Sequence, residues 1–217
     1  MGREGYWAAM TTSRRSPAAL EAIDKITSLE QLDQPAKLIG KAVRDAVPAG
    51  PVKDALSGTW LGHALHPLLT DLPIGTWTSA VLLDWLGGER SEAAADRLIA
   101  LGIAFTAPAV ATGWTEWADS EVADDGVRRI GIVHAAANVG ATTLFGASLV
   151  ARRGGSRGTG KLLALAGASS GASPSIASIA SWGALVVMRR AIPFAAHERS
   201  RAVRRPRSRP PRRPQPA

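Results

Sequence analysis

The sequence contains no cysteine, and this absence limits the chemistry open to the chain. Without thiols it forms no disulfide, and it holds neither zinc nor an iron–sulphur cluster through thiolates. Phosphate-binding glycine loops, nucleophile elbows, HExxH sequences and kinase signatures are missing as well. A metal ion would therefore depend on histidine, carboxylate or backbone oxygen ligands. The sequence assigns no catalytic residue and no enzyme class.

Charged side chains are scarce in three long stretches of the chain. Residues 98–115 and 162–188 contain no Asp, Glu, Lys or Arg, and residues 130–151 contain one titratable side chain, His134. Each stretch approaches or exceeds the roughly 20 apolar residues that a helix needs to cross a bilayer. The stretches predict membrane spans at about 98–117, 130–151 and 162–188. A soluble bundle with very apolar core helices is the alternative interpretation.

A further span is predicted at about 67–86, although Asp71 and Asp84 interrupt it. Charged groups at membrane depth are costly, so this helix must lie among other helices. Asp84, at the far end of the span, is expected to form a surface pair with the charges of the following loop. The fold prediction is an all-α, polytopic membrane four-helix bundle over residues 58–188.

The two ends of the chain differ from this middle. Residues 1–57 are charged throughout, so no cleaved secretory signal is expected. Within them, residues 17–47 place apolar side chains at helical spacing and predict one or two amphipathic helices on the membrane surface. Residues 189–217 are rich in Arg and Pro and are expected to be disordered. Much of the net charge of +8 arises in this tail, which is predicted to contact anionic lipid headgroups and no specific nucleic acid.

The basic residues also predict how the chain lies in the membrane. Loops rich in Lys and Arg tend to remain in the cytoplasm. If the N-terminus is cytoplasmic, twenty of the 26 Lys and Arg residues lie on that side and six on the other. The prediction is a multi-pass protein of the cell inner membrane with both termini in the cytoplasm.

In this orientation the first span begins, the second ends and the third begins at the same face of the membrane. Six candidate site residues gather there: His63, His66, Asp71, Glu116, His134 and Asn138. In one hypothesis, the three histidines ligate haem or a metal ion. In the other, they relay protons with the two carboxylates, and Asn138 adds a hydrogen-bonding partner one turn beyond His134. Asp71 and His134 are expected to face the bundle interior and pair.

A structural interpretation competes with both hypotheses. The histidines would then bond to backbone or lipid headgroups, and Asp71 would cap a broken helix turn before Pro73. The tryptophans near this face, Trp114 and Trp117, would serve as interfacial anchors, as aromatic side chains commonly do at the edges of a membrane.

One segment, residues 58–84 with the sequence GTWLGHALHPLLTDLPIGTWTSAVLLD, resembles the predicted-membrane-protein family called domain of unknown function 2231. The resemblance extends through VRRIGIVHAAAN at residues 127–138 and covers roughly residues 40–170. It implies a small polytopic membrane protein without an established activity. It also implies that the histidine–proline pair at 66–67, Asp71, Pro73 and His134 occupy signature positions.

The resemblance also implies a partner, and the chain differs from the family pattern in the fourth span. Members of this family sometimes precede a Rieske iron–sulphur domain, which implies a Rieske-type or other redox protein as a partner. The family pattern implies a Gly-Gly-His-Leu type motif in the fourth span, whereas residues 182–185 read Trp-Gly-Ala-Leu. Residues 174–217 therefore depart from the family, and their composition suggests a shifted reading frame.

These observations rank three functions. The first is a non-enzymatic integral membrane module for redox or proton-coupled partners. The alternative is a haem- or metal-binding membrane protein that uses interior histidines. A small transporter or channel ranks last, because the sequence shows neither inverted repeats nor paired broken helices.

Overall fold

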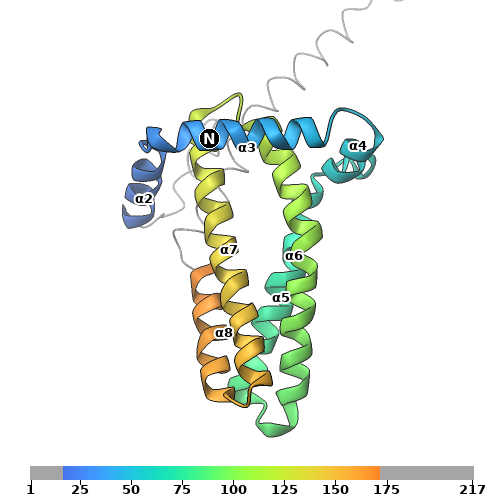
Figure 1. Cartoon of the computed structure of the whole chain (residues 1–217), viewed down its shortest axis with the longest axis vertical. Coiled ribbons are helices and arrows are strands. Elements are labelled where there is room, and N and C mark those ends of the chain that lie inside the picture. The colour runs from blue at the N-terminus through green and yellow to red at the C-terminus, as the bar shows by residue number, and fades with distance from the viewer. Residues whose placement is uncertain (1–16, 172–217) are drawn as a thin grey trace, which may run out of the picture. The chain divides into compact units, whose positions relative to one another are not determined.

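The computed structural model describes residues 17–171, and every regular element in that range is helical (Figure 1). The all-α prediction is therefore confirmed. The α-helices are α2 (Pro17–Thr27), α3 (Asp33–Ala46), α4 (Pro51–Ser57), α5 (Leu65–Leu86), α6 (Glu92–Ser120), α7 (Asp125–Arg153) and α8 (Arg157–Gly171). Three short 3-10 helices, η1 (Glu30–Leu32), η2 (Thr59–Leu61) and η3 (Glu89–Ser91), join them.

Two of the described helices are long and apolar enough to cross a membrane, one over Glu89–Ser120 and the other over Asp125–Arg153. Helices α6 and α7 each contain 29 residues and are thus about 44 Å long, which exceeds the roughly 30 Å of a bilayer core. Only 28% of the apolar window of the first span and 17% of that of the second are buried. A core helix of a soluble protein would bury most of its apolar side chains, so these surfaces suit lipid.

The other two predicted spans, at about 67–86 and 162–188, are not among these candidate spans. Helix α5 has 22 residues and covers the predicted 67–86 segment, but it is not among the two helices apolar enough to count as spans. Helix α8 covers the start of the predicted 162–188 segment, and residues 172–188 of that prediction lie outside the described range. The disorder predicted for residues 189–217 also lies outside it.

The four long helices pack most closely as two pairs, α5 with α6 and α7 with α8. Their shared core consists of Ala80, Ala95, Ile99, Phe145 and Ala164. Across it, the rings of Trp77 and Phe145 stack with centroids 4.2 Å apart. A Cβ at Gly102 would lie 2.2 Å from Trp77 Nε1, so the absence of a side chain there makes room for the indole. Small residues thus set the spacing of the helices.

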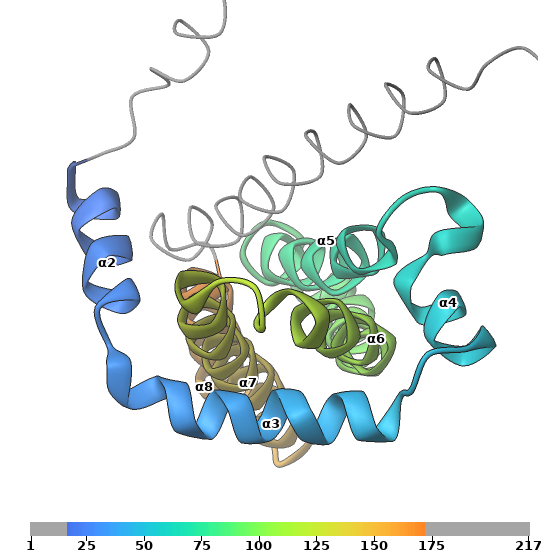
Figure 2. The same ribbon diagram turned by 90° about the horizontal axis from the view of Figure 1, so that it is seen from above.

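Helix α3 lies across the ends of α6 and α7 (Figure 2). The side chain that holds it there is Glu121, only 1% exposed, in the turn between those helices. Its Oε1 accepts from Arg44 Nη1 of α3 at 2.7 Å, and its Oε2 accepts from Arg128 Nε of α7 at 2.7 Å. Gly40 lets α3 approach, because a Cβ there would lie 2.5 Å from Glu121 Oε1. One carboxylate therefore joins three helices.

A second ion pair fixes the start of α3. Asp33 accepts two hydrogen bonds from Arg129 of α7, with Oδ1 2.9 Å from Nε and Oδ2 2.8 Å from Nη2. This hydrogen-bonded guanidinium holds the pKa of Asp33 below its ordinary value of 3.8. The charged form of Asp33, and the contact it makes, therefore persist to lower pH than an ordinary aspartate would allow.

The opposite end of the helices contains a buried ionic cluster. Asp84 of α5 and Arg152 of α7 are fully buried and paired, with Arg152 Nη1 2.8 Å from Asp84 Oδ1. Asp96 of α6 lies 3.0 Å from Arg152, and Arg157 of α8 lies 3.3 Å from Asp84. The expected surface pair at Asp84 is wrong. Its partner Arg152 lies 68 residues away in sequence, and the spacing of neighbouring residues does not predict such a contact.

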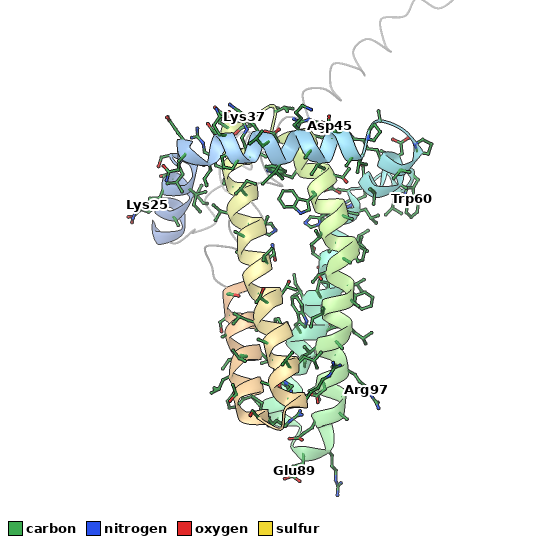
Figure 3. All side chains as sticks on the ribbon, viewed as in Figure 1. Lys25, Lys37, Asp45, Trp60, Glu89 and Arg97 are labelled. Atoms are coloured by element: carbon green, nitrogen blue, oxygen red, sulfur yellow. The ribbon has the colours of Figure 1, made fainter. Side chains whose placement is uncertain are left out.

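Exposed charges also mark the two ends. Lys37 and Asp45 lie at the α3 end, whereas Glu89 and Arg97 lie at the end where α5 turns into α6 (Figure 3). The lengths of α6 and α7 run between these two charged levels. The arrangement matches that of a protein whose middle contacts lipid and whose ends contact water.

Candidate functional site

The candidate site lies near the α3 end, where α5 begins, α6 approaches its end and α7 completes its third turn. His66 stands in the first turn of α5, and its backbone N–H donates to Glu116 Oε1 of α6 at 3.2 Å. The first N–H groups of a helix lack partners within the helix, and a carboxylate is favourable there. Glu116 therefore anchors the start of α5 and places His66 against α6.

The His66 ring is held in one tautomer by its hydrogen bond. Its Nδ1 lies 2.8 Å from the backbone oxygen of Ala109, which can only accept. Nδ1 must therefore carry the proton, and Nε2 is left with a lone pair. The ring packs on Gly113, where a Cβ would lie 2.7 Å from His66 Cε1. A side chain at that glycine would push the imidazole out of place.

His134 of α7 is fixed in a different way. Asn138 Nδ2 lies 2.9 Å from the His134 backbone oxygen and 2.9 Å from His134 Nε2. Because the backbone oxygen only accepts, the amide nitrogen is the donor, and His134 Nε2 must accept from it. The proton of neutral His134 then resides on Nδ1. That atom is buried and has no hydrogen-bond partner among the described residues.

The two imidazoles are complementary. His66 offers a lone pair at Nε2, whereas His134 offers an N–H at Nδ1. No hydrogen bond joins the two rings in the described part of the chain, so a proton could pass between them only through an intervening group such as a water molecule. The two rings therefore present one free acceptor and one free donor.

A second buried donor lies close to His134 along α7. The indole Nε1 of Trp117 is buried without a partner among the described residues. It packs on Gly131, where a Cβ would lie 2.1 Å from Nε1. Gly131 precedes His134 by three residues, and residues three apart lie on neighbouring positions of a helix surface. The Trp114 and Trp117 rings meet edge to face at 5.2 Å.

The structure does not bring all six predicted residues together. His63 is exposed, and its Nδ1 bonds to the adjacent Ala64 oxygen at 2.8 Å. Asp71 is exposed and has no hydrogen-bond or ion-pair partner in the described part of the chain, so the expected pairing with His134 is not seen. Within residues 17–171, no three His, Asp or Glu side chains are grouped to hold a metal ion.

Sequence reasoning named Asn138, which orients His134, but missed the groups that position His66 and Trp117. The Ala109 carbonyl oxygen belongs to the backbone and leaves no trace in the sequence. Gly113 and Gly131 matter only because a ring from a neighbouring helix lies on each. A glycine and an aromatic residue at the same predicted depth of adjacent spans is the one sequence signal that could have indicated them.

Comparison with known proteins agrees with the sequence resemblance. A profile of the family described as predicted membrane protein (DUF2231) matches residues 62–195, which is more than half of the chain. The departure from the family that the sequence suggests from residue 174 is therefore wrong for residues 174–195. No curated protein and no solved structure matches. The family description supports association with a lipid bilayer, in accord with the two candidate spans. The chain belongs to the DUF2231 family of predicted membrane proteins.

Proposed function

We propose that the chain is a multi-pass module of the inner membrane in which His66 and His134 exchange a proton for a redox or proton-coupled partner. A Rieske-type protein is the kind of partner that the family resemblance implies. Both termini would lie in the cytoplasm, which puts the α3 end and the histidines at the cytoplasmic face. Helix α5 and the predicted 162–188 segment would complete four spans with α6 and α7.

The observation that carries the proposal is a pair of ring nitrogens at the same predicted depth, one a free hydrogen-bond acceptor and the other a free donor. His66 Nε2 has a lone pair, because Nδ1 bonds to the Ala109 oxygen at 2.8 Å. His134 Nδ1 has an N–H, because Asn138 occupies Nε2 at 2.9 Å. A purely structural histidine would use its buried nitrogen in a hydrogen bond, and His134 does not do so within the described residues.

Glu116 supports the same proposal. Its carboxylate touches the His66 backbone and stands one turn before Ser120, where α6 ends. A half-buried carboxylate between the histidines and the end of the helices can receive a proton from the aqueous side. A proton that enters from the aqueous side would thus reach Glu116 before the histidines, and we assign Glu116 as the entry residue.

Haem or metal binding is the second candidate, and one feature favours it. The unbonded lone pair at His66 Nε2 is what an iron or zinc ligand requires. His134 fits less well, because Asn138 already occupies the only lone pair of its neutral ring. Ligation by both histidines would require the amide to turn away. The donor set therefore favours proton exchange over ligation by two histidines.

Histidine titration tests the proposal. Two groups that share a proton titrate as a coupled pair, so each signal should change in two steps. In purified protein with nitrogen-15 labelled histidine, we expect the His134 ring signals to follow a two-step curve in the wild type. In His66→Gln the curve should become a single step. His63→Gln is the matched control. His63 is exposed and bonds to the adjacent Ala64 oxygen, so its replacement should leave both steps intact. Independent single-step curves in the wild type would refute proton exchange between the rings.

A further inference from the structure

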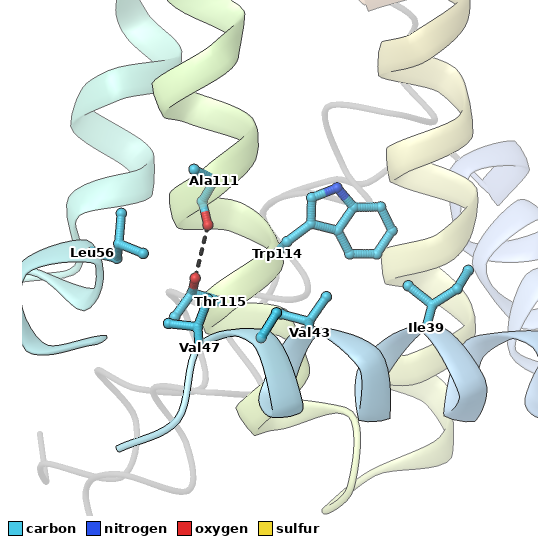
Figure 4. A pocket seen from close by; sticks show the side chains of 8 residues that line it. Ile39, Val43, Val47, Leu56, Ala111, Trp114 and Thr115 are labelled. Atoms are coloured by element: carbon cyan, nitrogen blue, oxygen red, sulfur yellow. Dashed lines mark hydrogen bonds between the residues drawn. The ribbon is translucent and has the colours of Figure 1, made fainter. Parts of the chain in front are cut away.

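A separate apolar groove opens beside the α3 end of α6. Its volume is about 260 Å³. Helix α3 forms one wall, α6 forms the other, and α4 closes one side (Figure 4). The lining residues are Ile39, Val43, Ala46, Val47, Leu56, Ala111, Trp114 and Thr115.

The lining offers little to a polar ligand. Thr115 is its only hydroxyl, and that group donates to the Ala111 backbone oxygen at 2.8 Å within α6. The indole of Trp114 contributes an aromatic face, and the other lining side chains are aliphatic. An apolar surface of this kind favours an apolar occupant over water. The lining therefore favours a hydrocarbon occupant.

The position of the groove indicates the source of that hydrocarbon. Ala111 and Trp114 belong to α6, a candidate membrane span of which only 28% of the apolar window is buried, and Val110 beside them is exposed. In the adjoining α4–η2 segment, the Trp60 side chain is 69% exposed. Exposed tryptophan is typical of the membrane interface. The groove is thus the end of a lipid-facing surface, at the depth where acyl chains begin.

We propose that this groove holds an acyl chain of a bilayer phospholipid. Its volume of about 260 Å³ lies just below the roughly 300 to 1,000 Å³ of sites for drug-sized ligands and is enough for part of one acyl chain. A chain in this position contacts α3 and α6 at once, and it therefore joins the surface helix to the span. The site is independent of the histidine pair and extends the chain's role to specific lipid binding.

The test uses Trp114 as the probe. In full-length protein whose other tryptophans are phenylalanine, reconstituted with phosphatidylcholine brominated on its acyl chains, Trp114 fluorescence should be quenched strongly. Ala46→Phe fills the groove from α3 and should reduce that quenching at least twofold. Ala42→Phe is the matched control, because Ala42 lies one turn earlier on α3, is exposed and does not line the groove.

A second measurement tests the proposal without the tryptophan replacements, which could themselves disturb the fold. Native mass spectrometry of the otherwise unaltered protein should detect one retained phospholipid, which Ala46→Phe loses and Ala42→Phe keeps. Equal quenching in both variants would overturn the proposal. So would protection of Trp114 from brominated chains, because another segment of the chain or a protein partner would then fill the groove.

Discussion

Replacing Arg152 by methionine should lower the free energy of unfolding by about 3 to 5 kcal/mol. The substitution leaves Asp84 fully buried beside an uncharged side chain, and removing one partner of a buried pair costs far more than removing an exposed one. Arg157 compensates only in part, since it lies 3.3 Å from Asp84 and also neutralises Asp96. Denaturant unfolding of the detergent-solubilised protein measures the effect.

The neighbouring arginine supplies the control for this result. Arg153 is exposed and takes no part in the cluster, so Arg153→Met should change stability by less than about 1 kcal/mol. The double variant Asp84→Leu with Arg152→Met should recover much of the loss, because apolar replacement of a whole buried pair is often neutral. A similar loss in both single variants would mean that the cluster does not hold the four helices together.

Replacing Glu121 by alanine should loosen α3 on the ends of α6 and α7, at a cost of about 3 kcal/mol, although the Asp33–Arg129 pair still holds its start. Arg128 then remains buried without one of its two carboxylate hydrogen-bond partners, and Arg44 loses its side-chain partner at 2.7 Å. Amide hydrogen exchange should report the change as faster exchange in α3, while α5 keeps its protection. The effect is local because α3 packs on the spans only at this end.

Asp119→Ala serves as the comparison on the same helix end. Asp119 pairs with Lys53 at 2.6 Å, but both side chains are partly exposed, and such pairs contribute less than about 1 kcal/mol. Its removal should leave exchange in α3 almost unchanged. If Asp119→Ala loosened α3 as much as Glu121→Ala does, burial of the Glu121 carboxylate would not be the reason that α3 stays in place.

The long apolar helices could be predicted from sequence, and the contacts between them could not. The stretches 98–115 and 130–151 contain no Asp, Glu, Lys or Arg, and this alone places α6 and α7. Apolar spacing over residues 17–47 likewise predicts α2 and α3. Asp84 was misjudged because the residue that neutralises it, Arg152, stands at the far end of another helix. Pairings of this kind depend on tertiary structure.

The candidate site shows the same division. Sequence placed His66, Glu116 and His134 at one level, because helix lengths and orientation determine the depth of each residue. It could not distinguish exposed His63 and Asp71 from the histidines that face the helix interface, since that depends on helix rotation. The tautomers depend on a backbone oxygen and an amide, and only coordinates supply their geometry.

The protonation of the two rings tests the central claim most directly. At a pH where both histidines are neutral, nitrogen-15 spectra should show His66 and His134 each protonated at Nδ1 and unprotonated at Nε2. In Asn138→Leu the His134 preference should disappear, while His66, bonded to Ala109, should keep its own. A wild-type spectrum with the His134 proton on Nε2 would contradict the account, because the ring would then present no donor to its partner.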